Sequence, residues 1–460
     1  MITWIKQFFK IEERNTSIKT EVLAGITTFL AMAYILPVNS GMLSGAGVPF
    51  GGVFFATAIA SAIACLIMGL VANYPVALAP GMGINAFFTY NVVLFGFPGV
   101  EWRGALAAVF ISGILFLIVS VTGIRRAVIN AVPQGLKFAV GAGIGFFITF
   151  IGLKNMGLVV SNPATLVQLG NIAHPAVLLG IFGLILVIIL YSMGNKFSLI
   201  IAITATAIVG LLLGAFGVST MPAFSTDFSV GFFGEVGETL FAPFRGGFQE
   251  LFSNPSAWFI IFIFLFVDFF DTAGTLMAVG NQAGLINENS ELVGGDRALL
   301  ADAIGTIGGS MIGTSTVTSY IESSTGIEQG GRTGLTAVTV AALFLISLLI
   351  YPLLSVVTGV FDPETGIVYS PVTAMALVMV GALMVTQLKN IEWGDKAILV
   401  PAFLTIVFMI FTFSIAEGIA VGFIFYPIIM IFTKRAKEVN PIMYVLMIVF
   451  VLFFALQAIM

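Results

Sequence analysis

Three carboxylates lie inside long apolar stretches of this chain, where acidic residues are expensive to place. Asp268 and Asp271 lie in FIIFIFLFVDFFDTAGTLMAVG, and Glu322 lies in GTSTVTSYIESSTGI. A charged side chain at the centre of a bilayer costs about 3 kcal/mol on insertion scales. Such residues oppose folding unless they face a cavity, share protons or bind a polar ligand, so we interpret all three as functional residues.

The spacing of these residues predicts a polar, cavity-lining stripe. On a helix, Asp268 and Asp271 lie on one face, and Thr272 and Thr275 continue it. Asn85 lies in a second interrupted apolar segment, near the expected start of a half-helix. Carboxylate acceptors, an amide and free backbone N–H groups suit a small, flat, neutral heterocycle with N–H and C=O edges.

Some roles stay open at this level. Asp271 either orients Asp268 or carries a proton itself, and Asn85 is either a ligand group or a helix cap. Phe87 and Phe88 could offer an aromatic face to a bound ring. Glu417 is better explained as an interfacial cap, and His174 lies in a loop before a proline.

The composition defines the environment in which these side chains act. The chain has 460 residues, of which 59% are hydrophobic and 9% charged, whereas soluble proteins carry about 25% charged residues. The apolar stretches are helix-length, so we predict an all-α polytopic membrane protein and not a β-barrel. Cys65 is the single cysteine, which excludes an internal disulfide.

Fourteen apolar segments form two sets of seven, separated by the polar stretch 220–255. The predicted segments are 22–43, 51–73, 76–97, 103–122, 133–156, 174–193, 197–219, 256–280, 298–312, 313–330, 333–357, 370–388, 396–413 and 416–433. A further apolar stretch, 441–459, either spans the membrane or lies in its interface. An odd number of spans per half inverts the second half relative to the first, which predicts an inverted repeat.

Basic residues predict a cytoplasmic N-terminus. With that orientation, fifteen of the 18 Lys and Arg residues fall on the inner face. Residues 1–21 are basic and amphipathic, and we predict a surface helix there instead of a signal peptide.

The third segment of each half is interrupted by Pro, Gly, Ser and Thr. YPVALAPGMGINAFFTY (74–90) and GTSTVTSYIESSTGIEQGG (313–331) each predict a short extended piece, at 76–79 and 315–319, followed by a half-helix. Broken backbone at membrane depth is tolerated where it lines a cavity. Paired broken segments in matching positions indicate a transporter's substrate site, although two packing kinks would give the same pattern.

Enzyme motifs are absent from the sequence. It contains no GxxxxGK[ST], GxSxG or HExxH, and it has one histidine. We therefore predict a transporter without a cofactor, metal site or nucleic-acid partner; a channel or a membrane enzyme is the weaker alternative. The GAGIG run at 141–145 predicts a helix-packing face along which two parts of the protein slide.

Four stretches together resemble the nucleobase–cation symporters, specifically the AzgA-like hypoxanthine/guanine permease branch. They are GITTFLAMAYILPVN (25–39), ALAPGMGINAFF (77–88), DFFDTAGTL (268–276) and TSTVTSYIESSTGI (314–327). The first segment lacks the Gln-His pair of xanthine and urate permeases, and Asp268 stands where those branches and uracil permeases carry Glu. Both differences favour the hypoxanthine/guanine branch, while adenine or another nucleobase stays open as substrate.

The resemblance implies a fourteen-helix fold of two inverted seven-helix repeats, with a core and a gate. The expected parts are a cytoplasmic N-terminus (1–21), core (22–123), gate (124–255), core (256–357), gate (358–435) and an apolar tail (436–460). It implies proton-coupled purine import across the cell membrane, driven by the proton gradient; a homodimer is left open. The expected substrate-binding residues are Asp268, Glu322, Asn85, Gly83 and Thr272. The expected proton-coupling residues are Asp271, Asp268 and Glu322.

Overall fold

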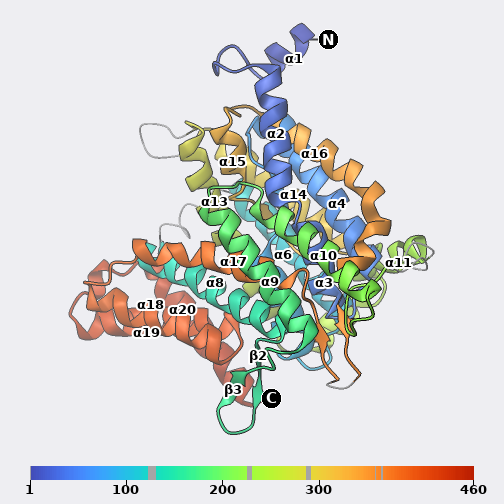
Figure 1. Ribbon diagram of the computed structural model, residues 1–460. Helices are drawn as coiled ribbons and strands as arrows, with labels where there is room; N and C mark the ends of the chain where they lie inside the picture. The colour runs from blue at the N-terminus through green and yellow to red at the C-terminus, as the bar shows by residue number, and fades with distance from the viewer. Residues whose placement is uncertain are drawn as a thin grey trace.

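The computed structural model describes residues 2–122, 131–224, 231–285, 292–357, 359–363 and 366–459, and it is predominantly helical (Figure 1). The helices of the first half are α1 (Ile2–Phe8), α2 (Ile18–Met32), α3 (Ile35–Ser44), α4 (Phe50–Ile67), α5 (Met82–Ala86), α6 (Trp102–Thr122), α8 (Gln134–Met156), α9 (Pro175–Ser192), α10 (Ser198–Ala215), α11 (Phe232–Thr239) and α12 (Gly247–Ser253). Those of the second half are α13 (Ala257–Gln282), α14 (Gly295–Ile312), α15 (Ser323–Glu328), α16 (Gly334–Ser347), α17 (Ala374–Val385), α18 (Lys396–Phe411), α19 (Ile415–Phe432) and α20 (Pro441–Ile459).

Several helices change geometry within one apolar segment. The π-helical stretches η1 (Met68–Ala72) and η2 (Phe87–Leu94) extend α4 and α5, and the 3₁₀ stretches η5 (Leu348–Val357) and η6 (Thr386–Asn390) extend α16 and α17. Two further 3₁₀ turns, η4 (Ala242–Phe244) and η7 (Ala436–Glu438), and three short antiparallel strand pairs complete the described structure. The strand pairs are β1 (Leu78–Pro80) with β4 (Val317–Ser319), β2 (Val159–Asn162) with β3 (Leu166–Leu169), and β5 (Val360–Phe361) with β6 (Val368–Tyr369).

The predicted class, a helical polytopic membrane protein, is confirmed. Eight helices among the described residues are long and apolar enough to cross a membrane. Of the other predicted segments, 256–280 and 298–312 coincide with the long helices α13 and α14, and the rest coincide with shorter or broken helices. The start of the first segment differs from its prediction. The Ser17 hydroxyl accepts a hydrogen bond from the Thr20 amide at 3.1 Å, so α2 begins at Ile18 and not at residue 22. The predicted surface helix over 1–21 is accordingly limited to the seven residues of α1.

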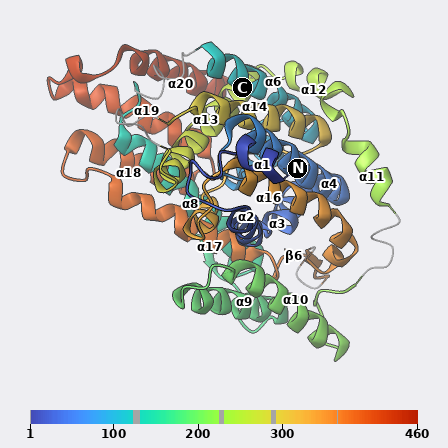
Figure 2. The same cartoon turned by 90° about the horizontal axis from the view of Figure 1, so that it is seen from above.

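The helices pack as two groups. The core group contains α2, α3, α4, α5 with η2, α6, α13, α14, α15 and α16, with α4 lying between α14 and α16. The flanking group contains α8, α9, α10, α17, α18 and α19, in which α8 packs against both α17 and α18. Viewed from above, α9 and α10 lie along one edge of the core group, and α18 and α19 lie along another (Figure 2). The groups meet where α5 contacts α8 and where η2 contacts α19.

The glycines at 141, 143 and 145 form a helix-packing face, as predicted, but this face lies within the flanking group and not between the two groups. A Cβ added at Gly143 would lie 2.5 Å from the sulfur of Met409 in α18, and one at Gly145 would lie 2.7 Å from the carbonyl of Gly381 in α17. Both neighbours belong to the flanking group. The prediction of a sliding surface between core and gate was therefore wrong, because these glycines let helices of one group approach each other closely.

The C-terminal helix α20 packs along α13 and α19. The Phe450 ring lies 5.8 Å from Phe262 and 5.7 Å from Phe423, and Phe453 lies 5.4 Å from Phe259. These pairings make α20 antiparallel to α13. The apolar stretch at 441–459 therefore contacts both helix groups through a shared aromatic cluster.

Candidate functional site

Two broken segments cross at the centre of the candidate site. Strand β1 pairs antiparallel with β4, with Leu78 opposite Ser319 and Pro80 opposite Val317. The Gly81 amide continues the pairing by donating to the Thr316 carbonyl at 3.0 Å. This pairing satisfies backbone groups that would otherwise be exposed within the membrane. Extended pieces were predicted at 76–79 and 315–319. The structure confirms both, although β1 is shifted toward its half-helix and β4 begins two residues later than predicted.

Side chains of neighbouring helices hold the crossing in place. The Thr306 hydroxyl of α14 accepts a hydrogen bond from the Val317 amide at 3.0 Å, and the Cys65 thiol of α4 accepts one from the Leu78 amide at 3.2 Å. The Tyr320 hydroxyl donates to the Pro80 carbonyl at 2.5 Å. The strands are thus attached to the core group on several sides, which positions the half-helices that follow them.

Four carboxylates lie next to this crossing and interact in sequence. Asp268 interacts electrostatically with Asp302 of α14 and with Asp271, and Asp271 interacts with Glu322. Asp268 is 1% exposed, and Asp302 is fully buried. Oδ2 of Asp271 lies 3.6 Å from the position that a Cβ at Gly81 would take, so this carboxylate faces the end of β1.

None of the three predicted acids forms an ion pair with the residues that the structure describes. No Lys or Arg nitrogen of those residues lies within 4.0 Å of Asp268, Asp271 or Glu322. The partners they do have are hydroxyls: Thr306 lies 3.5 Å from Oδ2 of Asp268, and Thr318 donates to Asp271. Uncompensated buried acids of this kind are typical of sites that bind protons or polar ligands.

Thr272 occupies the side of α13 that faces α14. Its hydroxyl donates a hydrogen bond to Oδ2 of Asp302, and the residue is fully buried. Asp271, by contrast, faces the strands. The polar stripe predicted on α13 is therefore divided: Thr272 contacts α14, and Asp271 faces the strands. The predicted contact between Thr272 and a substrate remains a prediction.

Asn85 lies in the half-helix α5, directly after β1. Both its Nδ2 and its Oδ1 are buried and lack a hydrogen-bond partner among the described residues. The same holds for Oδ1 of Asp268 and for the hydroxyls of Ser315, Thr316 and Ser319. Buried polar atoms nearly always have partners, and those that do not call for an explanation such as a bound ligand or water.

Gly83 faces the flanking group. A Cβ at Gly83 would lie 2.7 Å from Cγ2 of Ile144 in α8, so this position controls how closely α5 approaches α8. Phe87 and Phe88, which follow on η2, are both fully buried, and the Phe87 ring packs edge-on against Phe264 at 4.9 Å. Phe264 lies one helical turn before Asp268, so an aromatic wall and the carboxylates share one region of α13.

Glu322 lies at the start of the second half-helix, α15. Its Oε1 accepts a hydrogen bond of 2.6 Å from the Tyr34 hydroxyl. Glu322 and Asn85 were both predicted at the beginning of half-helices, and the structure confirms these positions.

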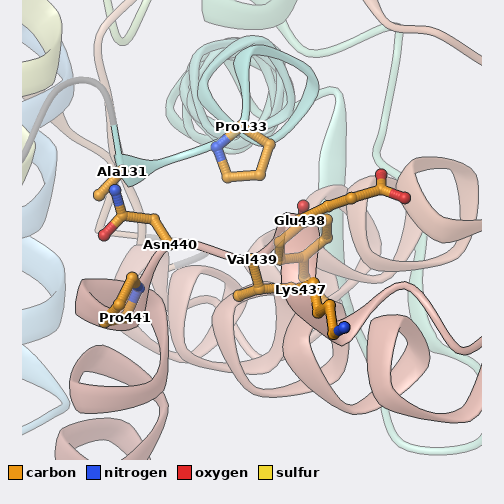
Figure 3. Close-up of a pocket in the computed structure, with 8 residues that line it drawn as sticks. Ala131, Pro133, Lys437, Glu438, Val439, Asn440 and Pro441 are labelled. Carbon is orange, nitrogen blue, oxygen red and sulfur yellow. The ribbon is translucent and has the colours of Figure 1, made fainter.

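A separate surface hollow of about 380 Å³ lies away from the carboxylates (Figure 3). Pro133 and the turn joining α19 to α20, including Lys437 and Asn440, form its walls. It contains none of the predicted site residues. Within the described ranges, no three His, Cys, Asp or Glu side chains are grouped to hold a metal ion.

Two residues of this region were missed by the sequence analysis. Asp302 carries the same signal as Asp268, an acid inside an apolar segment (298–312), and could have been found on that basis. Tyr34 gave no comparable signal, because a tyrosine in an apolar segment is common and its partner Glu322 is 288 residues away.

Buried acids on paired, broken helices of a polytopic membrane protein are typical of a transporter's substrate site. The comparisons with known proteins agree with this class. The model of the Permease family (Xan_ur_permease) matches residues 19–421, and the chain belongs to this family. Its members are transporters and not enzymes, as the sequence predicted.

Two relatives illustrate the range of the family. The chain is 48% identical to the guanine/hypoxanthine permease PbuG of Bacillus subtilis, over 98% of this chain and 99% of the relative. It is 40% identical to the adenine permease AdeP of Escherichia coli, over 97% and 95% of the two chains. Among solved structures, the transmembrane domain of the cyanobacterial bicarbonate transporter BicA has a TM-score of 0.61 at 14% identity, over 88% of this chain and 96% of that one. This last likeness concerns the fold alone.

Proposed function

We propose that this protein imports purine nucleobases, hypoxanthine or guanine, by proton symport across the cell membrane. The observation that carries the proposal is the unpartnered Asn85 amide on α5, which contacts α13. That helix carries Asp268 and Asp271, neither of which has an ion-pair partner among the described residues. A purine presents N–H donors to carboxylates and ring acceptors to an amide, so it matches both kinds of group. Similarity to the guanine/hypoxanthine permease PbuG at 48% identity supports the choice of substrate.

The proposed roles follow from these surroundings. Asp268, Glu322 and Asn85 contact the nucleobase, while Gly83 and Thr272 shape the site from α5 and α13. Asp271 is our leading proton carrier, because it interacts with Glu322 on one side and with Asp268 on the other. Interacting acids titrate as a group, so binding a proton at one site is coupled to the charge of its neighbours.

Transport occurs by alternating access between a core and a gate, built from two inverted seven-helix repeats. The antiparallel pairing of β1 with β4 supports this arrangement, because it brings the matching broken segments of the two halves together. The core group carries all four carboxylates, and α8 of the flanking group faces it across Gly83. Movement of one group against the other would expose the site to either side with its internal geometry retained.

Adenine is the second candidate substrate, and the 40% identity to the adenine permease AdeP is the observation that favours it. Adenine carries an exocyclic amino group where hypoxanthine carries a carbonyl. The same carboxylates could accept from that amino group, so the charge of the site alone does not discriminate the two. Ligand competition is therefore part of the test.

Uptake of labelled hypoxanthine into proteoliposomes tests the proposal. We expect accumulation when the outside is more acidic than the inside, its collapse with a protonophore, and competition by guanine. Full accumulation driven by a sodium gradient alone would overturn the proton assignment. Competition by adenine but not by guanine would replace the proposed substrate with the second candidate, and no accumulation of any nucleobase would overturn both.

A further inference from the structure

Tyr34 lies where the first apolar segment is broken between α2 and α3. Pro37 explains the break, because it has no N–H to donate to the Ala33 carbonyl, and the Leu36 amide donates to that carbonyl instead at 3.2 Å. The tighter turn interrupts the helix at Ala33 and Tyr34. The Tyr34 side chain is 1% exposed, and the break places it beside Glu322.

The contact between Tyr34 and Glu322 has the length of a charge-assisted hydrogen bond. The Tyr34 hydroxyl donates to Oε1 of Glu322 at 2.6 Å, within the range of about 2.5–2.7 Å that O–H···O⁻ bonds adopt. A carboxylate rotates freely about its last bonds unless a partner fixes it. The Tyr34 hydroxyl is such a partner for Oε1.

We propose that Tyr34 is a positioning residue for the transported nucleobase, acting through Glu322. The hydroxyl fixes Oε1, so that Oε2 is presented to an N–H group of the substrate in one orientation. This inference rests on the proposed function of the site. The first apolar segment then determines nucleobase affinity together with the two half-helices and α13.

Tyr74 provides a matched control. It is also 1% exposed, and its hydroxyl donates to the backbone carbonyl of Val293 at 2.7 Å, a bond of similar length that involves no carboxylate. Tyr34→Phe and Tyr74→Phe each remove one buried hydroxyl and keep the ring. A purely structural role of Tyr34 predicts the same effect for both substitutions.

The test measures equilibrium binding and initial uptake of labelled hypoxanthine by the full chain in proteoliposomes, together with thermal stability. For Tyr34→Phe we expect Kd and KM to rise about tenfold, which corresponds to about 1.4 kcal/mol, with the maximal rate changed by less than about twofold. The pH dependence of KM should also change, because the ionised form of Glu322 has lost a donor. Tyr74→Phe should keep the wild-type Kd, KM and pH profile.

Two outcomes would overturn the assignment. In the first, the wild-type protein binds hypoxanthine and Tyr34→Phe binds it with the same affinity. In the second, Tyr34→Phe and Tyr74→Phe lose affinity and melting temperature to the same extent. If the unchanged protein binds no nucleobase at all, the proposed function fails together with this inference, so the two failures are distinguished by the wild-type measurement.

Discussion

Cγ2 of Ile144 occupies the space that a side chain at Gly83 would need, 2.7 Å from the position of an added Cβ. Gly83 belongs to the core group, and Ile144 belongs to α8 of the flanking group. The contact therefore limits how closely the two helix groups approach each other beside the candidate site.

Gly83→Ala should slow uptake more than it weakens binding, because the added methyl group pushes α5 away from α8. Ile144→Ala in the same chain should restore much of the rate by making room. Initial uptake rates beside equilibrium Kd values check this. If Ile144→Ala gives no rescue and the affinity is lost, Gly83 contacts the substrate directly.

Asp268→Asn and Glu322→Gln should each abolish concentrative uptake. An amide keeps the shape of the acid but loses its charge and half of its acceptor capacity. Each variant should still insert into the membrane and keep a melting temperature at or above that of wild type, since a buried charge is costly. Near-normal accumulation by both variants would remove these residues from the site.

Thr272→Val should lower the uptake rate, whereas Thr272→Ser should retain it. The hydroxyl donates to Asp302, and removing one partner of a buried hydrogen bond costs about 1–3 kcal/mol. Valine keeps the volume and removes the donor. If Thr272 acts through Asp302, then Thr272→Val adds no further defect to Asp302→Asn; an additive defect in the double variant would indicate an independent role.

Phe450→Ala should lower the free energy of unfolding by about 3 kcal/mol. Phe450 is 1% exposed and packs against Phe262, Phe266 and Phe423. Val451 is 48% exposed on the same helix, and Val451→Ala should have little effect. Equal stability of the two variants in detergent would show that α20 does not hold α13 and α19 together.

Asp395 provides a pH-dependent contribution to stability outside the membrane. The Arg435 guanidinium, at 2.8 Å, holds the pKa of Asp395 below its usual value, and the Ala397 amide adds to the effect. The resulting stability is fully present above the unfolded pKa of about 3.9, and it is lost as pH falls through the lower folded value.

Asp395→Asn, which keeps an acceptor for the Ala397 amide, should therefore reduce the melting temperature slightly at pH 7 and by a smaller amount at pH 3, where part of the contribution has been lost. The reduction should be small, because exposed ion pairs contribute little. A difference from wild type that is equally large at both pH values would show that the ion pair is not its cause.

The sequence by itself determined the membrane class, the approximate positions of most apolar segments and the presence of three acids within them. These features depend on local composition: an apolar run of helix length is visible in the chain, and an acid within it is conspicuous because of its desolvation cost. The interruptions by Pro, Gly, Ser and Thr likewise mark the two crossing segments, because these residues end or weaken a helix wherever they occur. The strand bounds differ from the predicted ones by only one or two residues.

Only the tertiary structure decided which side chains meet. The bond between Tyr34 and Glu322 joins residues 288 positions apart, and the bond between Thr272 and Asp302 turns one residue of the expected stripe toward a neighbouring helix. The glycines at 143 and 145 were assigned to the wrong surface for the same reason. A small residue in a helix indicates a close approach, but the partner that approaches is set by the packing of helices distant in the chain.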